Sequence, residues 1–232
     1  MKRIKPYGVS GNRRIAKPYA RTPGRLYAVL PFLVLSACIS SCDLFSTRTP
    51  ASPDLGSTFI WTPAETPNTL LSNFKATIEV LDATNYTKCF VSAKDSSVTG
   101  EKLTYSFTYR SGLDATSRSL FDLWNIQSEQ NFMTKLRSPL VSSPRLTVTF
   151  SNTSTDQSNS NSARIKSDYL ILLPVQSNSS FPASISGSLI LEVVLVTTEQ
   201  ATKEWRIVTW QDFAPPSGNS KTFTDLKVLL SS

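Results

Sequence analysis

The 232-residue chain contains no histidine, three cysteines and eight glycines. Without histidine, His-dependent proton transfer and Ser-His-Asp catalysis are excluded. The cysteines form no CxxC pair, which argues against a structural zinc site. The glycines form neither GxGxxG nor GxxxxGK[ST], the motifs whose backbones cradle phosphate groups. We therefore expect no cofactor and no bound metal.

Most of the chain also lacks a basic excess. The formal net charge is +7, from 24 basic and 17 acidic residues, but eight of the bases lie in residues 1–25, which contain no acid. From Cys42 onward the remaining 24 − 8 = 16 bases face 17 acids. A nucleic-acid groove needs clustered Lys and Arg on the folded part of a protein. We therefore expect no nucleic-acid partner.

The longest uncharged run is LYAVLPFLVLSACISS, the 16 residues Leu26–Ser41, and it follows the basic leader. A membrane-spanning helix needs about 20 apolar residues. A basic start, an apolar core of about 7–15 residues and small residues at its end are typical of a secretory signal. The run therefore predicts export. An uncleaved anchor or an ordinary signal peptide is an open alternative to the lipoprotein signal described next.

The end of this run resembles the bacterial lipobox, in Leu35-Ser36-Ala37-Cys38 and, more loosely, in Ile39-Ser40-Ser41-Cys42. The resemblance implies lipidation of the cysteine, cleavage before it and acylation of the new amino terminus. Several acyl chains together hold a protein stably on a membrane. Cys42 is favoured because a polar tether rich in Pro, Ser and Thr follows it, whereas Cys38 has the better lipobox. Both remain candidates.

These features divide the chain into a signal peptide (1–41), a flexible tether (42–64) and a folded domain (65–232). We expect a location in the bacterial cell envelope, with the domain outside the cytoplasm and a lipid holding it to the membrane. If Cys42 is lipidated, Cys89 has no cysteine partner. It is then expected to pack as a small buried apolar group.

In the domain, the spacing of apolar residues predicts helices and strands. The first helix is expected from Thr66-Pro67 to Leu81, and a second, shorter helix follows a cap at Asp82 or Thr84. A third is expected over Ile126–Leu136, with Asn125 as its cap, and a fourth within 222–232. Strands are expected over 103–109, 146–150, 169–173, 189–196 and 205–213, with long solvated loops at 151–163 and 174–184. Helices grouped early and strands later favour an α+β fold, a curved antiparallel sheet wrapped around the N-terminal helices with a short C-terminal helix.

The segments 66–90, 121–136 and 204–213 resemble the nuclear-transport-factor-two-like superfamily, also called SnoaL-like or cone-shaped. Within it, the chain looks most like lipoproteins of unassigned function. The resemblance implies a cone-shaped α+β domain over about residues 65–230. It also implies that the domain can form a homodimer through its sheet.

Tyr105, Phe107 and Tyr109 share the apolar face of an alternating segment and are the candidate ligand-binding residues. They could line a cavity or simply fill the core. The leading hypothesis is a non-enzymatic lipoprotein that binds a small apolar ligand or an envelope protein. The alternatives are an assembly module that dimerises, and an isomerase-like enzyme. The resemblance implies that such an enzyme would use Asp168 or Asp212 with Tyr105 or Tyr109.

Overall fold

The computed structural model describes residues 59–112, 119–141, 144–176, 180–215 and 220–231. The predicted leader and most of the predicted tether, with both candidate lipidation sites Cys38 and Cys42, lie outside the described residues. The elements are α2 (Pro67–Val80), α3 (Ala83–Thr87), β1 (Thr108–Arg110), the 3₁₀ helix η2 (Ser119–Phe121), α5 (Ile126–Leu136), β2 (Thr147–Asn159), β3 (Ser162–Leu172), β4 (Ser184–Thr197), β5 (Lys203–Phe213) and α6 (Phe223–Ser231). None of the helices in these ranges is long and apolar enough to cross a membrane.

The helices begin at the predicted caps. Thr66 accepts a hydrogen bond from the backbone N–H of Thr69 at the start of α2. Asn125 and Ser128 form a reciprocal capping box at the start of α5, which satisfies backbone donors that the helix itself leaves free. Of the two candidate caps of the second helix, the structure selects Asp82. The predicted bounds of α5, 126–136, are confirmed.

The sheet has the strand order β1-β5-β4-β3-β2. Strands β2 to β5 pair antiparallel, as predicted, but β1 pairs with β5 in parallel, with Tyr109 opposite Trp210. The predicted antiparallel pairing is thus confirmed for β2 to β5, and the parallel strand β1 at one edge makes the sheet mixed. The cause is topological. Helix α5 and strands β2, β3 and β4 lie between β1 and β5 in the chain, and a connection of this length can return in the same direction, as a tight hairpin cannot.

The strand predicted over 103–109 is much shorter, because only Thr108–Arg110 pairs with β5. Tyr105 precedes this strand and is 44% exposed, whereas Phe107 and Tyr109 are buried. The three aromatic residues therefore do not share one buried strand face. The sequence alternation extends further than the backbone pairing that would make it a strand.

The solvated loop predicted over 151–163 is also wrong. Strand β2 continues to Asn159 and β3 begins at Ser162, so this segment is a paired hairpin. From Ser151 to Asn159 every residue of β2 is exposed. This part of the edge strand has no apolar face, and its backbone hydrogen bonds to β3 keep it in the sheet. Its polar composition also discourages pairing with a second chain. The other predicted connection, 174–184, does separate β3 from β4.

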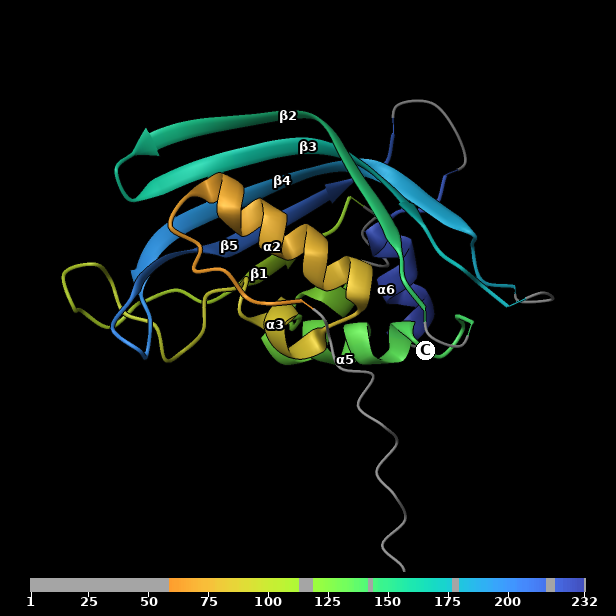
Figure 1. Ribbon diagram of the computed structural model, residues 1–232, viewed down its shortest axis with the longest axis horizontal. Coiled ribbons are helices and arrows are strands. Elements are labelled where there is room, and N and C mark those ends of the chain that lie inside the picture. The colour runs from red at the N-terminus through yellow and green to blue at the C-terminus, as the bar shows by residue number, and fades with distance from the viewer. Residues whose placement is uncertain (1–58, 113–118, 142–143, 177–179, 216–219, 232) are drawn as a thin grey trace, which may run out of the picture. The chain divides into compact units, whose positions relative to one another are not determined.

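Figure 1 shows the sheet curving over α2, α3, α5 and α6, which lie on its concave side. This confirms the predicted α+β fold with a curved sheet wrapped on helices. The core between the layers is rich in aromatic rings, and Phe74 packs edge-on against Trp210 with centroids 5.3 Å apart. Cys89 is buried and unpaired in this core, and burial raises the pKa of its thiol to about 12.

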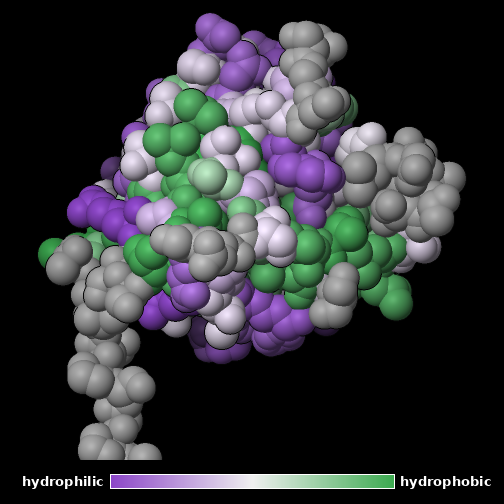
Figure 2. All heavy atoms as spheres, turned by 90° about the vertical axis from the view of Figure 1, so that its right-hand side faces the viewer, coloured by the Kyte–Doolittle hydropathy of each residue, from purple (hydrophilic) through white to green (hydrophobic). Residues whose placement is uncertain are grey.

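Apolar side chains also reach the surface near the terminal helix. Figure 2 shows the end of the domain where α6 and the loop between β3 and β4 lie, with apolar groups gathered in patches among polar ones. Leu229 of α6 is 50% exposed and Leu172 at the end of β3 is 48% exposed. The other face of α6 is buried, and it carries the site described below.

Gly187 of β4 leaves room for a ring that crosses the inner face of the sheet. It lies opposite Tyr169 of β3. A Cβ atom at this position would be 2.5 Å from the carbonyl oxygen of Phe213 and 2.6 Å from the hydroxyl of Tyr169. Any larger residue at this position must therefore displace Tyr169 or the backbone of β5.

We expect Gly187→Ala to lower the free energy of unfolding by roughly 1–3 kcal/mol, the usual effect of overpacking a core. Urea denaturation followed by circular dichroism measures this change. Ser186→Ala is the matched control, because the neighbouring side chain points to the opposite face, and it should stay within about 0.5 kcal/mol of the wild type. Equal stability of the two variants would contradict the close contact.

Candidate functional site

The terminal helix α6 carries a charged residue on its buried face. Phe223, Leu226, Lys227 and Leu230 follow the i, i+3, i+4, i+7 spacing that places residues on one side of a helix. Lys227 is completely buried, and its Nζ donates a hydrogen bond to Oε1 of Glu129 on α5, which is also completely buried. Two charges removed from water need close partners on every side. The surrounding side chains supply these partners.

Aromatic rings surround the ammonium group of Lys227. Its Nζ lies 3.4 Å from the ring centroid of Tyr109 and 3.8 Å from that of Trp210, with Trp124 and Phe132 at 5.4 and 5.5 Å. A cation within about 6 Å of a ring face is attracted by the electron density of that face. The indole nitrogen of Trp210 is buried without a hydrogen-bond partner among the described atoms, so Trp210 contributes its ring face. We call these four rings the aromatic cage.

The carboxylate of Glu129 has three donors. Besides Lys227, the hydroxyl of Tyr86 donates to its Oε2 at 2.8 Å, and the indole N–H of Trp124 donates to its Oε1 at 2.7 Å. These donors come from α3, from α6 and from the segment that leads into α5. Hydrogen bonds to the charged form stabilise an ionised carboxylate inside a protein. The arrangement therefore holds an ion pair rather than a neutral acid and a neutral amine.

The pKa values follow from burial and from these charges. Burial lowers the pKa of Lys227 to about 8, and the negative charge of Glu129 opposes that change. Burial raises the pKa of Tyr86 and of Tyr109 well above 10. The charge of Glu129 raises the pKa of Tyr86 further, and the charge of Asp212 does the same for Tyr109. Both tyrosines thus remain protonated donors near neutral pH.

A second buried carboxylate, Asp212 of β5, holds the amino-terminal end of α6. It is 1% exposed. Its Oδ2 accepts hydrogen bonds from the backbone N–H and the hydroxyl of Thr224, at 2.8 and 2.6 Å, and its Oδ1 accepts from the hydroxyl of Tyr169 at 2.7 Å. That hydroxyl in turn accepts from the N–H of Phe223, and Tyr109 lies 3.3 Å from Oδ2. A carboxylate at a helix amino terminus satisfies free N–H groups and complements the helix dipole.

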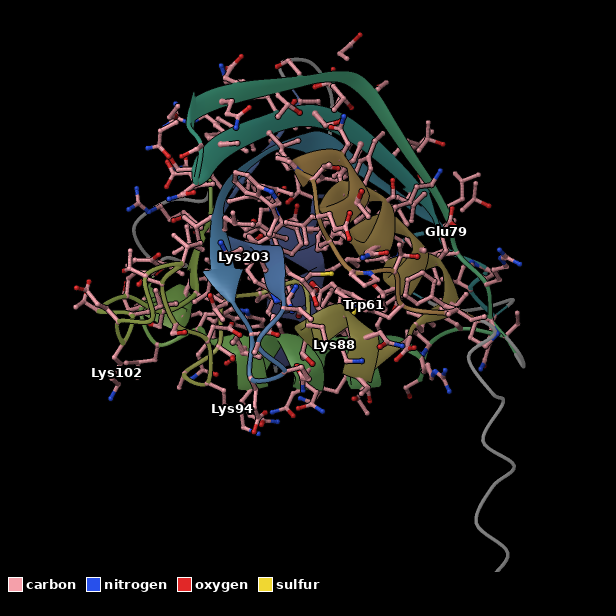
Figure 3. All side chains as sticks on the ribbon, turned by 60° about the vertical axis from the view of Figure 1, so that its left-hand side comes forward. Trp61, Glu79, Lys88, Lys94, Lys102 and Lys203 are labelled. Carbon is pink, nitrogen blue, oxygen red and sulfur yellow. The ribbon has the colours of Figure 1, made fainter. Side chains whose placement is uncertain are left out.

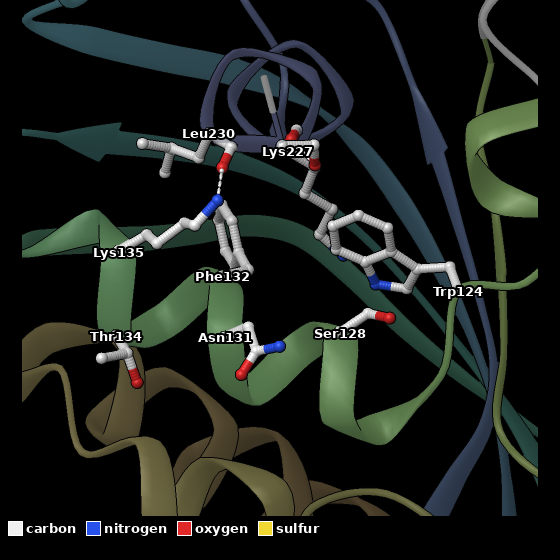
Figure 4. Close-up of a pocket in the computed structure, with 9 residues that line it drawn as sticks. Trp124, Ser128, Asn131, Phe132, Thr134, Lys135, Lys227 and Leu230 are labelled. Atoms are coloured by element: carbon white, nitrogen blue, oxygen red, sulfur yellow. Dashed lines mark hydrogen bonds between the residues drawn. The ribbon is translucent and has the colours of Figure 1, made fainter.

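A pocket of about 350 Å³ lies between α5 and α6 (Figure 4) and borders the aromatic cage. Trp124, Phe132 and Lys227 belong to both. Figure 4 shows Lys227 extending from α6 toward Trp124. It also shows the hydrogen bond that Nζ of Lys135 donates to the carbonyl oxygen of Leu230, which is 2.7 Å long. The remaining lining residues are Ser128, Asn131, Thr134 and Ser231. We call this space the α5–α6 pocket.

The predicted ligand-binding residues lie apart from one another. Tyr105 is at the surface, and Phe107 packs against Phe90 in the core with centroids 4.4 Å apart. Tyr109 is part of the aromatic cage and touches Asp212. Of the three predicted residues, the structure therefore brings only Tyr109 to this site.

The two candidate aspartates lie on opposite faces of the sheet. Because side chains alternate along a strand and Tyr169 points inward, Asp168 points outward. It accepts hydrogen bonds from Ser188 and Asn152, which lower the pKa of its carboxyl group. Asp212 is inside, and burial raises the pKa of its carboxyl group. Only Asp212 is therefore placed to act together with Tyr109.

The sequence interpretation missed Lys227 and Glu129, although the spacing contained a signal for both. Glu129, Phe132, Met133 and Leu136 follow the same i, i+3, i+4, i+7 pattern on α5 as the residues around Lys227 follow on α6. A single lysine and a single glutamate, each within an apolar stripe, would have predicted a buried pair between two helices.

A second hollow, of about 590 Å³, lies on the side of the domain shown in Figure 3. Trp61 is at its wall, with Lys88 and Arg206 each 5.6 Å from the ring centroid. Arg206 is paired with Glu204 at 2.8 Å, and Lys94 with Glu199 at 3.0 Å. Lys88 instead donates a hydrogen bond to Oδ1 of Asn85 at 2.8 Å. Because Asp95, Glu199 and Glu204 also line the hollow and match its three cations in number, this hollow offers no excess charge to a ligand.

No family model matches the sequence, and no curated protein matches it. Among solved structures, a nuclear transport factor 2-like superfamily protein from Salmonella enterica has 12% identity and a TM-score of 0.43, covering 65% of this chain and 89% of its own. A protein of unknown function with a cystatin-like fold from Nostoc punctiforme has 13% identity and a TM-score of 0.39, over 65% and 89%. A candidate scytalone dehydratase from Novosphingobium aromaticivorans has 10% identity and a TM-score of 0.43, over 67% and 89%.

We expect Lys227→Met to lower the free energy of unfolding by about 3–5 kcal/mol, because the buried carboxylate of Glu129 then loses its cation and also the N–H donor that even a neutral lysine amine keeps. Lys227→Met combined with Glu129→Gln should recover part of this loss. Lys135→Met is the control, since that lysine is exposed, and it should change stability by less than about 1 kcal/mol. Chemical denaturation of the three variants measures these changes in the free energy of unfolding. A loss for Lys227→Met no larger than for Lys135→Met would show that the pair is unimportant.

The stability of the wild type relative to the Lys227→Met, Glu129→Gln double variant should rise with pH above 8; the opposite effect of the buried Cys89 thiol, with its pKa of about 12, is common to both proteins and cancels. Lys227 has a folded-state pKa of about 8 against an ordinary 10.5, so between these values the unfolded chain binds more protons and alkali favours the fold. Relative to the Lys227→Met, Glu129→Gln double variant, we expect a gain of roughly 1–2 kcal/mol between pH 8 and 9.5. Thermal denaturation across this range measures it. The range stops below pH 10, where ionisation of tyrosines in the unfolded chain would act in the opposite direction.

Proposed function

We propose that this chain is a non-enzymatic lipoprotein of the bacterial cell envelope whose domain binds a small ligand with an apolar body. The lipid is placed on Cys42, with Cys38 as the alternative. The ligand site is the α5–α6 pocket. The observation that carries the proposal is that the two most deeply buried carboxylates among the described residues, Glu129 and Asp212, are engaged in holding α6, which leaves the pocket beside them to bind rather than to catalyse.

The lining of the pocket supports a binding role. Trp124 and Phe132 offer ring surface to an apolar body, and Ser128 and Asn131 offer hydrogen bonds that can orient it. Ligand sites are usually mostly apolar walls with a few placed polar groups, and their volumes are typically about 300–1,000 Å³. The pocket, at about 350 Å³, suits a small molecule.

One observation favours a second candidate, an isomerase-like enzyme. Asp212 has two tyrosine hydroxyls within hydrogen-bond reach and a raised pKa, and a carboxyl group paired with tyrosines in an apolar site can perform proton transfer. Against this, its Oδ2 is occupied by Thr224, and the carboxylate is almost completely enclosed. A substrate could reach it only if α6 moved away.

The test uses the full chain extracted from membranes in mild detergent and incubated with an envelope lipid extract. We expect native mass spectrometry to retain one small molecule per chain, because the pocket has room for one. Trp124→Ala should lower its occupancy at least tenfold by removing a ring wall. Leu229→Ala is the control, because Leu229 lies on α6 but outside the pocket, and it should bind as the wild type does.

The same spectra test the anchor and the alternatives. A chain that begins at Cys42 or Cys38 and carries acyl mass supports the lipoprotein, whereas an unlipidated chain that retains residues 1–37 contradicts it. A clean dimer without bound mass would favour the assembly module, and co-purification of one envelope protein would favour a protein partner. Either result, without retained small-molecule mass, would overturn the ligand-binding proposal.

A further inference from the structure

We propose that the aromatic cage is a binding site for a primary ammonium group, that Lys227 is its tethered occupant, and that the ligand of the α5–α6 pocket carries such a group. This inference rests on the proposed function, because it takes that pocket as the ligand site. It names the chemical class of the ligand and the residues that recognise it.

The cage has the composition that selects a cation. Ring faces of Tyr109 and Trp210 lie nearest the nitrogen, Trp124 and Phe132 lie further out, and the carboxylate of Glu129 supplies a full negative charge. Ring faces together with a neighbouring carboxylate attract an ammonium ion much more than a neutral group of the same size. The site is held together from several elements, and it is occupied by one flexible side chain.

The distances also select among cations. The nitrogen lies 3.4 Å from one ring centroid and 3.8 Å from another, which is about the contact distance of a single heavy atom with a ring. Methyl groups on the nitrogen would have to occupy the same space as the rings. The cage therefore fits a primary ammonium group and excludes a quaternary one.

A ligand can approach the cage from the α5–α6 pocket. Trp124 and Phe132 are walls of both, and Lys227 lines the pocket with its own chain. The apolar body of a ligand would lie between α5 and α6, with Ser128 and Asn131 beside it. Lys227 and Glu129 are both completely buried, so the ammonium group of a ligand reaches Glu129 only when the side chain of Lys227 moves out of the aromatic cage.

Exchange of one ammonium for another preserves the charge balance of the interior. When the incoming cation replaces Lys227 in front of Glu129, the buried carboxylate is never left without a partner, and the long lysine side chain can turn into the space that it already borders. A neutral or anionic ligand would displace the cation without replacing it, which leaves a buried unpaired charge. The exchange therefore discriminates by the charge of the ligand head.

The test compares three probes with the same six-carbon body: hexylammonium, 1-hexanol and hexyltrimethylammonium, each titrated calorimetrically into the full chain at pH 7. We expect Lys227→Ala to bind hexylammonium at least tenfold more tightly than the wild type, because the internal competitor is gone. Lys135→Ala is the matched control, from the same pocket but outside the cage, and should not show this gain. The other two probes should bind Lys227→Ala at least tenfold more weakly than hexylammonium.

A second measurement uses the unaltered chain and so does not depend on the folding of a variant. In protein labelled with ¹³C at the lysine ε-carbon, the Lys227 signal should be shifted strongly by the rings around it. Lys227→Met identifies that signal by its absence. Hexylammonium should move it to the position of exposed lysines, and 1-hexanol should leave it in place.

The outcomes separate this inference from the proposed function. If the three probes bind equally and the Lys227 signal stays in place, the ammonium inference is overturned while the pocket remains a ligand site. If none of the probes binds, the inference is again overturned, and the retained mass from the envelope extract decides the proposed function by itself. If lipid-extract mass is absent but hexylammonium still displaces Lys227, the cage is confirmed and the envelope-lipid ligand is wrong.

Discussion

The buried pair of Lys227 and Glu129 is the interaction on which the interior of this domain depends. A cation and an anion removed from water are stable only when they lie in close contact and their remaining hydrogen-bonding positions are filled. Here the donors to Glu129 come from α3, α6 and Trp124, which lies two residues before α5, while the rings around Lys227 come from β1, β5, α5 and the same Trp124. The pair thus fixes how these elements meet. Such a pair is costly to break, although it gives little net stability compared with apolar residues of the same volume.

The same reasoning makes α6 an integral part of the core. Its first turn satisfies Asp212, its middle satisfies Glu129, and Phe223 fills the space against Trp210, with ring centroids 4.8 Å apart. Without this helix, two carboxylates would remain inside an apolar chamber with no cation and no helix terminus beside them. The interior is therefore completed only by α6. Gly187 belongs to the same arrangement, since its missing side chain lets Tyr169 reach Asp212.

The sequence predicted the helices well, because their signals are local. Thr66, Asp82 and Asn125 act as caps through hydrogen bonds to residues three positions on, and apolar spacing identifies the buried faces of α2 and α5. The strands were harder to predict because pairing is not local. Nothing near Tyr105 shows that only residues from Thr108 onward meet β5, and the polar composition of β2 beyond Ser151 conceals a ladder whose partner is β3. The parallel pairing of β1 likewise depends on where the chain returns.

The site was missed for a different physical reason. Charged residues are assigned to the surface because burial of an isolated charge is costly, and this rule holds for Lys227 and for Glu129 taken singly. It fails for the two together, since each supplies what the other lacks, and they are 98 residues apart in the chain. Lys227 can be recognised as the counterion of Glu129 only when the apolar stripes of α5 and α6 are considered together. The same mutual dependence favours binding over catalysis at this position. An acid–base group must change its charge during a reaction, whereas a carboxylate that accepts hydrogen bonds from three donors and faces a cation near neutral pH is stabilised in one charge state.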